Sequence, residues 1–512
     1  MPTATVTGLF ELRVHNRNQG VGRRSLAMLL AVATLLLLAP LAQAQPLAQE
    51  LQRLMNSARL GDTRLGIIII DADTSEVLAS HNEGDAFIPA SNMKLLTSGA
   101  ALAILGPDFT FRTELLHAGD ALIVRGSGDP AFADPRLLRD MQLGVEEIIQ
   151  TWTRAAADAG VTGITELILD DRIFDDDWVH PSWPVEQLNR WYCAEVYGLN
   201  FHANVLSVYV SPTRPGMSPT VRTQPEAPWL NIGNIARTVT DGQNTIWVSR
   251  AAGTNSMRLH GNVRQTAERP IEVAVHDMPG IFGRLLAEEL ERAGVGRPSV
   301  RRAAPDEMLP QGKPIALVQT PMRVVMERCN TDSHNLYAEA LIKRMGHELT
   351  GRPGSWSTGA AAIRMVMQEK LNPRHAADVV IADGSGMSRQ NRVTPQMIAQ
   401  WLLALARDEE IRTALEESLP IPAESGTLRR RFGDTELRHT LRAKTGYLSG
   451  VTSLSGYLWD ENSGRRIVFS ILVNEVPSTM PMRRVRDFQE QVVSIADQWL
   501  ARATLAEVVN GE

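Results

Sequence analysis

The chain has 512 residues, of which 44% are hydrophobic and 21% are charged, and its formal net charge at pH 7 is -6. These are ordinary values for a large globular protein, and the acidic balance excludes a broad basic surface for nucleic acid. The length exceeds the usual size of one hydrophobic core, so two or three domains are expected.

The first 44 residues are typical of an export signal. Arg23-Arg24 precedes an apolar run over residues 26–38, and Ala42-Gln43-Ala44 resembles a cleavage site. The run is shorter than the roughly 20 residues that span a membrane, and no later segment is predicted to be transmembrane. We therefore expect cleavage near Ala44 and a periplasmic mature protein. Twin-arginine export is a less supported alternative, and the true translation start stays open.

A strand and a helix are the first elements predicted after the signal. The apolar run over residues 65–70 indicates a buried strand of a hairpin. From Ser91 onward, apolar side chains recur at helical spacing as far as Ile104, and Gly106-Pro107 ends the pattern. Ser91 is thus expected at the beginning of a core helix.

A long middle region separates this helix from the later motifs. Its strand-like segments are residues 167–169, 205–210 and 246–248, and its helix-like segment is residues 282–293. We predict that it is a β-rich insertion of one or two small domains within the catalytic domain. The expected division is residues 45–111 for the first catalytic part, 112–315 for the insertion and 316–512 for the second catalytic part.

Three strands and a helix are predicted near the C-terminus. Residues 442–445, 452–459 and 466–474 indicate an antiparallel meander, because turn residues separate them. Residues 488–508 are amphipathic but lack a basic polar face, which favours docking on the sheet over membrane binding. The predicted fold class is α/β (α+β), with an antiparallel sheet and helices interrupted by the β-rich insertion.

Three short motifs follow one another in the order Ser-x-x-Lys, Ser-x-Asn and Lys-Thr-Gly. They are Ser91-Asn92-Met93-Lys94, Ser333-His334-Asn335 and Lys444-Thr445-Gly446. The chain contains only five lysines, and two of them stand in these motifs. Each motif alone is a weak signal, but the ordered set is typical of penicillin-interacting serine enzymes.

The first motif supplies a nucleophile and its base. A serine hydroxyl is a poor nucleophile at neutral pH unless a base lies within hydrogen-bond reach. Helical i,i+3 spacing puts Ser91 and Lys94 on the same face. The pKa of a lysine is about 10.4 unless burial or a second cation lowers it, and Lys444 is the predicted source of that second charge.

Ser333 and Asn335 are predicted to serve proton transfer. Ser333 would relay a proton between Lys94 and the leaving amine, while Asn335 would orient Lys94 and the substrate amide. Both follow a predicted turn at residues 330–332 between two helices. The alternative is that Ser333 only caps the following helix.

The third motif is predicted to bind substrate along a strand. Lys444 and Gly446 would lie on one face of that strand and Thr445 on the other. Gly446 would let a ligand approach the backbone, and the N–H groups of Ser91 and Tyr447 are the expected oxyanion donors. The predicted substrate-binding residues are therefore Lys444, Thr445, Gly446 and Tyr447.

Further motifs make the resemblance to one family specific. They are Gly126-Ser127-Gly128-Asp129-Pro130, the segment from Asp383 to Arg389, residues 441–446 and Leu454-Ser455-Gly456-Tyr457. The chain resembles the D-alanyl-D-alanine carboxypeptidases and endopeptidases of the penicillin-binding protein 4 type, the class C low-molecular-mass penicillin-binding proteins. A long insertion after Ser-x-x-Lys is also a mark of that family.

The resemblance implies a periplasmic or cell-wall hydrolase. Such an enzyme cleaves the terminal D-Ala-D-Ala bond of peptidoglycan stem peptides, and often the cross-link between D-Ala and a diamino acid. The resemblance also implies that Thr445 helps to bind the terminal carboxylate and that penicillin acylates Ser91. The segment from Asp383 to Arg389 is interpreted as a tight turn that shapes the site without reacting.

One segment departs from the family pattern. The family often carries an acidic residue near a Trp-Pro-Trp-rich segment, whereas here residues 182–187 offer Glu186, which we interpret as a solvated side chain. The balance between carboxypeptidase and endopeptidase activity, the substrate diamino acid and the oligomeric state therefore stay open.

Other chemistries have less support in the sequence. His347-Glu348 begins like a zinc-binding helix, but position 351 is Gly, and no Gly-x-Ser-x-Gly elbow occurs. We expect no metal and no cofactor, and His334 and His347 are interpreted as surface or capping residues. Cys193 and Cys329 could form a disulfide or remain buried thiols.

Two other functions are alternatives to a D-Ala-D-Ala peptidase. A β-lactamase would use similar motifs, but the chain is long and shows no obvious dedicated deacylating carboxylate. A non-catalytic cell-wall scaffold could lose Ser91 or Lys94, whereas here all three motifs are intact.

Overall fold

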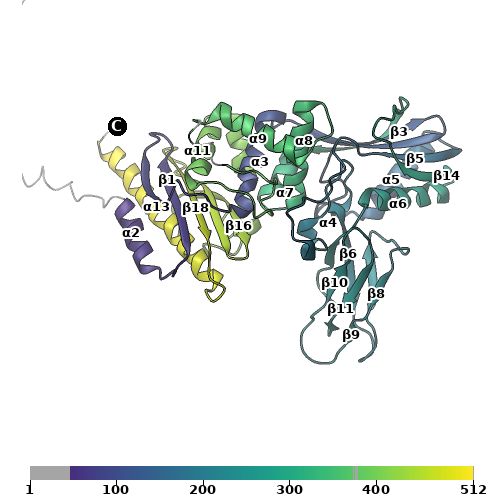
Figure 1. Ribbon diagram of the computed structural model, residues 1–512, viewed down its shortest axis with the longest axis horizontal. Coiled ribbons are helices and arrows are strands. Elements are labelled where there is room, and N and C mark those ends of the chain that lie inside the picture. The colour runs from purple at the N-terminus through teal and green to yellow at the C-terminus, as the bar shows by residue number, and fades with distance from the viewer. Residues whose placement is uncertain (1–46, 373, 375–378, 511–512) are drawn as a thin grey trace, which may run out of the picture. The chain divides into compact units, whose positions relative to one another are not determined.

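Five antiparallel strands from the two ends of the described chain form one sheet (Figure 1). The computed structural model describes residues 47–372, 374 and 379–510, so the predicted export signal lies outside the described residues. The strand order is β16-β17-β18-β1-β2. The strands are β1 (Arg64–Asp71), β2 (Val77–His81), β16 (Thr440–Leu448), β17 (Val451–Trp459) and β18 (Arg466–Asn474). The predicted hairpin and meander are confirmed, and β1 joins them by pairing with β18.

Helices cover both faces of this sheet (Figure 1). The helices on one face are α2 (Leu47–Ser57) and α13 (Met482–Asn510). Successive strand residues point to opposite faces, so Ile67 and Ile69 of β1 pack in the core beneath α2 and α13. Ile68 and Ile70 join the core of the helices on the other face. The predicted docking of the last helix on the sheet is confirmed.

The helices on the other face carry the first two motifs. They are α3 (Met93–Leu105), α7 (Met322–Asn330), α8 (Asn335–Thr350), α9 (Trp356–Lys370), α11 (Pro395–Leu405) and α12 (Glu409–Ser418). The helix α11 packs on β1 and β18, and α3 packs on α8 and α9. Fully buried Trp401 of α11 donates a hydrogen bond to the carbonyl of Leu95 on α3 at 2.9 Å. The core helix predicted after Ser91 is α3, and a single 3-10 turn, η1 (Ala90–Asn92), precedes it.

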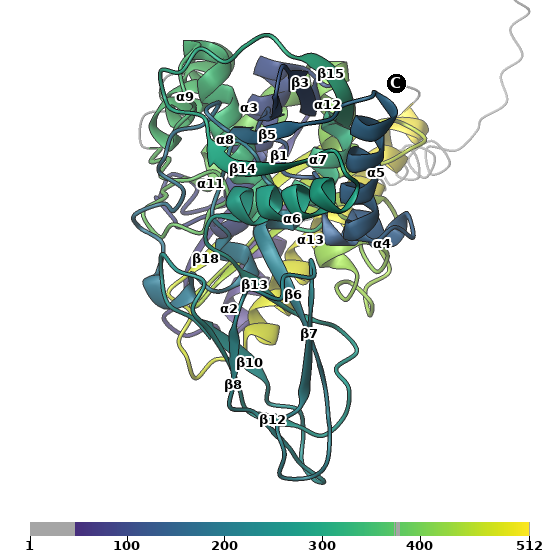
Figure 2. The ribbon, with the colours of Figure 1, turned by 90° about the vertical axis from the view of Figure 1, so that its right-hand side faces the viewer.

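A second five-stranded sheet is built from the middle of the chain (Figure 2). Its order is β14-β5-β4-β3-β15. The strands are β3 (Thr110–Ala118), β4 (Ala121–Gly126), β5 (Ile164–Asp170), β14 (Gly296–Arg302) and β15 (Lys313–Pro321). The helices α5 (Val145–Asp158) and α6 (Met278–Arg292) pack with this sheet through a core that contains Trp152 and Phe282. The pairs β4–β5 and β5–β14 are parallel, so the insertion is not a simple meander.

Three smaller sheets and a short helix complete the middle region. The small sheets have the orders β13-β6-β7, β10-β11-β8 and β12-β9. Their strands are β6 (Val205–Ser211), β7 (Thr220–Gln224), β8 (Ile232–Asn234), β9 (Arg237–Thr238), β10 (Trp247–Arg250), β11 (Met257–His260), β12 (Asn262–Val263) and β13 (Ile271–Ala274), and the helix is α4 (Pro135–Asp140). The three predicted strand segments correspond to β5, β6 and β10, and the predicted helix to α6.

The predicted domain boundaries at residues 112 and 315 fall inside strands. Position 112 lies in β3 and position 315 in β15, and these two strands pair with each other. The chain from Leu47 onward forms a single compact unit, so the division into domains stays a prediction. None of the described helices combines the length and apolar composition that a membrane crossing requires.

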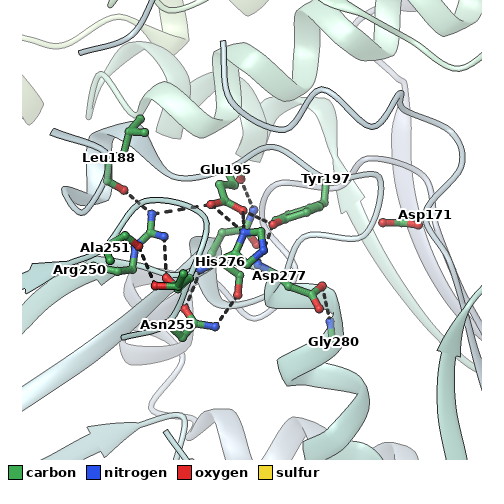
Figure 3. A network of polar contacts seen from close by, with 12 residues as sticks. Asp171, Leu188, Glu195, Tyr197, Arg250, Ala251, Asn255, His276, Asp277 and Gly280 are labelled. Carbon is green, nitrogen blue, oxygen red and sulfur yellow. Dashed lines mark hydrogen bonds and ion pairs between the residues drawn. The ribbon is translucent and has the colours of Figure 1, made fainter. Parts of the chain in front are cut away.

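A buried polar network fixes the loop of residues 182–197, between β5 and β6, to the rest of the inserted region (Figure 3). The Glu195 carboxylate accepts the hydroxyl of Tyr197 and lies 3.0 Å from His276 Nδ1. Arg250 of β10 forms an ion pair with Glu195 at 3.7 Å and donates to the carbonyl of Leu188 at 2.6 Å. Because the Glu195 and Arg250 side chains are almost completely buried, these contacts hold the loop firmly.

Candidate active site

Ser91 and Lys94 meet where η1 continues into α3. The ammonium of Lys94 donates to Ser91 Oγ at 3.3 Å, to Asn335 Oδ1 at 2.7 Å and to the carbonyl of Ser385 at 2.9 Å. Lys94 is completely buried. The structure therefore brings together the predicted nucleophile, the predicted base and Asn335 of α8.

Ser333 and Lys444 form a second pair beside the first. Lys444 on strand β16 donates to Ser333 Oγ at 2.8 Å and to the Thr445 carbonyl at 2.9 Å. Ser333 has φ 61°, a left-handed conformation that is uncommon for serine, in the turn between α7 and α8. Position 334, not Ser333, is the N-cap of α8. The capping alternative for Ser333 is therefore wrong.

Burial controls the charge of both lysines. Burial lowers the pKa of Lys94 to about 8, although nearby negative groups, including Glu339 and Asp383, oppose this shift. Burial and repulsion from Lys94 hold the pKa of Lys444 well below its ordinary value. We predicted that the charge of Lys444 would lower the pKa of Lys94. Burial is instead the main cause of the lowered pKa of Lys94. Repulsion between the two lysines contributes to the lowered pKa of Lys444. A neutral lysine is thus accessible near physiological pH.

Glu339 is a supporting residue that the sequence reasoning missed. It is completely buried on α8 and accepts hydrogen bonds from Gly384 N at 3.0 Å, Ser385 N at 2.8 Å and Trp356 Nε1 at 2.7 Å. These contacts turn the Ser385 carbonyl toward Lys94. Burial and the neighbouring Asp383 raise the pKa of Glu339 to about 7. One feature of the sequence could have identified Glu339. It lies four residues after Asn335 on the same helix, so the two side chains are on the same face.

The segment from Asp383 to Arg389 shapes the site as expected. Asp383 accepts hydrogen bonds from the Gly386 and Ser388 N–H groups at 2.9 and 2.6 Å, which closes a tight turn. It also accepts the Nε1–H of Trp183, from the 182–197 loop, at 2.9 Å. The Asp383 side chain therefore closes the turn through hydrogen bonds to two backbone N–H groups.

The 182–197 loop also sets the orientation of Asn335. Asn335 Nδ2 donates to the carbonyl of Tyr192 at 2.8 Å, which leaves Oδ1 facing Lys94. Tyr192 lies three residues before Glu195 and four after Leu188, so the network of Figure 3 anchors the loop on both sides of it. The inserted region is therefore linked to Lys94 through the side-chain amide of Asn335.

Gly446 and Thr445 differ in their surroundings. A Cβ atom at Gly446 would meet Ser453 Oγ, Pro89 O and Ser91 N, so this glycine lets β16 pack against the Ser91 turn. We expected a glycine at position 446 because a ligand would approach the backbone there. The geometry instead indicates that glycine is needed for the packing of β16 against the Ser91 turn. Thr445 Oγ1 donates to Thr427 Oγ1 at 2.8 Å.

An open cavity of about 590 Å³ lies over these groups. Its lining includes Ser91, Ser333, Asn335, Thr445, Gly446, Tyr447, Glu186 and Arg389. Tyr447 is 56% exposed, and Glu186 is exposed as expected. Lys94 and Lys444 are fully buried beneath this surface and donate hydrogen bonds to the Ser91 and Ser333 hydroxyl groups that line it.

The structure also places the cysteines and histidines that the sequence singled out. Cys193 and Cys329 are free, buried thiols, and burial raises the pKa of Cys329 to about 11. His347 lies in the last turn of α8 and contacts the Arg352 carbonyl at 2.9 Å. His334 is 6% exposed and occupies the N-cap position of α8, so of its two interpretations the capping position is confirmed and the surface position is wrong. Within residues 47–372, 374 and 379–510, no group of three or more His, Cys, Asp or Glu side chains could hold a metal ion.

This combination of a helix-borne serine with a buried lysine, beside the edge strand of a five-stranded sheet, defines the class of penicillin-recognising serine hydrolases. A model of the D-Ala-D-Ala carboxypeptidase 3 (S13) family matches residues 47–499. The chain therefore belongs to the D-Ala-D-Ala carboxypeptidase 3 (S13) family and is a serine-type hydrolase.

Relatives and solved structures agree over most of the chain. A D-alanyl-D-alanine carboxypeptidase of Actinomadura sp. (strain R39) is 29% identical over 468 residues, covering 85% of this chain and 82% of the relative. The D-alanyl-D-alanine carboxypeptidase DacB of Haemophilus influenzae is 23% identical, covering 80% of this chain and 85% of the relative. The crystal structure of penicillin-binding protein 4 from Haemophilus influenzae superposes with a TM-score of 0.71 at 20% identity, covering 86% of this chain and 98% of that chain. The predicted fold class and family resemblance are thereby confirmed.

Proposed function

We propose that this carboxypeptidase removes the terminal D-Ala of peptidoglycan stem peptides through an acyl-enzyme on Ser91. The observation that carries the proposal is the 3.3 Å hydrogen bond between Lys94 Nζ and Ser91 Oγ, at a lysine whose pKa is lowered to about 8. Neutral Lys94 takes the Ser91 proton as the oxygen bonds to the substrate carbonyl carbon. The C–N bond then breaks, and an ester remains on Ser91.

Ser333 and Lys444 serve the departure of the amine. The leaving D-Ala nitrogen needs a proton, and the Ser333 hydroxyl, 2.8 Å from Lys444 Nζ, lines the cavity where that nitrogen departs. Asn335 holds Lys94 in place during both steps. Water then attacks the ester, releases the shortened peptide and restores the Ser91 hydroxyl.

The strand β16 binds the substrate and its oxyanion. The N–H groups of Ser91 and Tyr447 donate to the developing oxyanion, which the close packing of Gly446 against Ser91 N supports. Thr445 and its neighbour Thr427 provide hydroxyl groups for the terminal carboxylate of the substrate. Both threonines line the same cavity as Ser91.

The substrates and inhibitors follow from the family. Its relatives carry the name D-alanyl-D-alanine carboxypeptidase, and one solved structure of the Haemophilus influenzae penicillin-binding protein 4 holds a β-lactam. A β-lactam places a reactive carbonyl where the scissile amide of D-Ala-D-Ala would lie, so it should acylate Ser91. With the export signal expected in residues 1–44, the enzyme works on the wall in the periplasm.

Replacement of Ser91 by alanine tests the nucleophile. We expect Ser91→Ala to lose fluorescent-penicillin labelling and to release D-Ala from a stem pentapeptide at least about 10³-fold more slowly, because no oxygen remains to form the ester. Labelling is read on a denaturing gel with peptide mapping, and D-Ala release is measured in parallel.

Ser80→Ala is the matched control, since Ser80 is exposed on strand β2. It should label and hydrolyse like the parent chain. Peptidase activity in Ser91→Ala close to the parent level would rule out Ser91 as the nucleophile. Label that leaves the parent enzyme within seconds would favour a β-lactamase, and a parent enzyme that neither labels nor hydrolyses would favour a scaffold.

The pH dependence tests the base. The charged form of Lys94 cannot accept a proton, and its fraction falls as pH rises through the lowered pKa of about 8. We therefore expect the acylation rate constant to rise about tenfold per pH unit below that value and to level above it. Stopped-flow acylation by penicillin over a pH series measures this profile. A rate that is flat or falls between neutral pH and the pKa would contradict the assignment of Lys94.

A further inference from the structure

Asp134 joins the inserted region to two helices of the catalytic site. It is completely buried and is the N-cap of α4, where its Oδ1 accepts the N–H groups of Arg136 and Leu137 at 2.8 and 3.0 Å. Its Oδ2 accepts Nη2 of Arg328 on α7 at 2.9 Å and the hydroxyl of Tyr337 on α8 at 2.8 Å. One carboxylate oxygen thus caps a helix of the insertion, and the other contacts the two helices that flank the Ser-x-Asn motif.

Arg328 in turn holds both chain neighbours of Ser333. Its Nη1 donates to Asp332 Oδ2 at 2.5 Å, and its main-chain carbonyl accepts the N–H of His334 at 3.1 Å. Arg136 also forms an ion pair with Asp332. Because Ser333 lies between Asp332 and His334, Arg328 constrains the backbone on both sides of it.

The conformation of Ser333 depends on such a constraint. Its φ of 61° is left-handed, and a serine keeps this unfavourable conformation only where the surrounding structure determines it. In this conformation Ser333 Oγ accepts Lys444 Nζ at 2.8 Å and lines the catalytic cavity. A turn that relaxed to an ordinary conformation would move this hydroxyl relative to Lys444. The contacts of Arg328 therefore maintain the position of the Ser333 hydroxyl.

The charge of Asp134 is needed to keep Arg328 in place. Burial raises the pKa of Asp134, but the charge and the hydrogen bond of Arg328 outweigh it and lower the pKa to about 2, so the carboxylate is ionised at neutral pH. The Arg328 side chain is 8% exposed, and a charged hydrogen bond is strong in such surroundings. Without the Asp134 charge, the buried guanidinium would lack a partner and would shift toward Asp332 and the cavity.

We propose that Asp134 is a positioning residue for Ser333, because it holds Arg328 and thereby the turn in which Ser333 meets Lys444. The proposal rests on the function proposed above, in which Ser333 serves the departure of the amine. The inserted region then contributes to the reaction at a second place, separate from its 182–197 loop. Asp134 itself lies behind the turn and acts through Arg328.

The leaving group separates this role from a general effect on the site. With an amide substrate, the C–N bond breaks as the nitrogen takes the proton of the Ser333 hydroxyl, and the proton that Lys94 took from Ser91 restores that hydroxyl. With a thiol ester of the same acyl peptide, the thiolate leaves with the electron pair of the C–S bond and needs no proton. A misplaced Ser333 should therefore slow cleavage of the amide and spare the thiol ester.

The test compares a stem pentapeptide ending in D-Ala-D-Ala with the thiol ester analogue of its last bond, in the parent enzyme and in Asp134→Asn. Asparagine keeps an oxygen that caps α4, but its amide nitrogen faces Arg328 and Tyr337, which need an acceptor. We expect kcat/KM to fall at least about tenfold for the pentapeptide and to change less than about twofold for the thiol ester. Release of D-Ala and of the thiol is measured in parallel.

Three further variants make the result specific. Adding Asp134→Asn to Ser333→Ala should change kcat/KM for the pentapeptide less than about twofold, because residues that act through one path are not additive. Asp408→Asn, at the exposed N-cap of α12, is the matched control and should behave like the parent enzyme. If Asp134→Asn does not fold, Asp332→Ala carries the test, since it removes the link between Arg328 and the turn and should show the same selective loss.

Three results would overturn the role of Asp134. They are equal losses for the pentapeptide and the thiol ester, no loss for either, and a loss in the Ser333→Ala background as large as in the parent background. Failure of the proposed function looks different. In that case Ser333→Ala alone would slow both substrates equally, or the parent enzyme would cleave neither of them.

Discussion

Replacement of Lys94 by methionine should lower the rate of Ser91 acylation by about 10⁴-fold, the upper range for a general base. Lys94 is completely buried, and its Nζ is the described side-chain nitrogen that contacts Ser91 Oγ. Methionine has a similar length and no charge, so it fills the space without accepting a proton. Stopped-flow labelling with fluorescent penicillin measures acylation, and D-Ala release from a pentapeptide measures turnover.

Two controls make this result specific. Lys313→Met, at an exposed lysine that begins β15, should leave both rates unchanged. Lys444→Met should lower turnover while leaving the Lys94–Ser91 contact in place, because Lys444 bonds to Ser333 and not to Ser91. Acylation by Lys94→Met within tenfold of the parent enzyme would show that another group serves as the base.

The motifs and apolar runs identified much of the architecture for a physical reason. A strand such as β1, buried on both faces, leaves an unbroken apolar run, and a helix such as α3 leaves a periodic one. Residue types that a reaction needs can also be recognised in the sequence. The motifs therefore identified five candidate site residues, which are Ser91, Lys94, Asn335, Ser333 and Lys444. Their assembly depends on backbone geometry, which the spacing of the motifs does not contain.

Main-chain partners explain most of what the sequence did not reveal. Lys94 donates to the carbonyl of Ser385, and Asn335 donates to the carbonyl of Tyr192, yet every residue type carries a carbonyl. Parallel pairing of β4, β5 and β14 was likewise invisible, since short apolar runs do not show their partners. The helix α5 was missed although Val145, Ile149 and Trp152 lie at helical spacing.

The inserted region therefore does more than enlarge the molecule. Its 182–197 loop presents a carbonyl to Asn335 and an indole to Asp383, and the buried contacts around Glu195 fix that loop (Figure 3). Asn335 and the turn after Asp383 are two of the three contacts of Lys94. The position of Lys94 thus depends on contacts that the insertion makes with Asn335 and with the turn after Asp383.

Removal of the Glu339 side chain should give the largest loss of stability. Glu339→Ala would leave three buried N–H donors, on Gly384, Ser385 and Trp356, without a partner. An unpartnered buried donor costs about 1–3 kcal/mol, so we expect the free energy of unfolding to fall by about 3–5 kcal/mol. Chemical denaturation followed by tryptophan fluorescence measures this change, because Trp356 packs beside Glu339.

Glu339→Gln separates the charge of this residue from its packing. The amide keeps the volume and an acceptor oxygen, so the stability loss should be about half or less. The carboxylate of Glu339 raises the pKa of Lys94, so its removal should lower that pKa and move the acylation profile below the parent midpoint of about 8. Glu369→Gln, at an exposed carboxylate on the neighbouring helix α9, should change neither stability nor profile. A Glu339→Gln profile that stays in place, or shifts to higher pH, would show that Glu339 does not act on Lys94 through its charge.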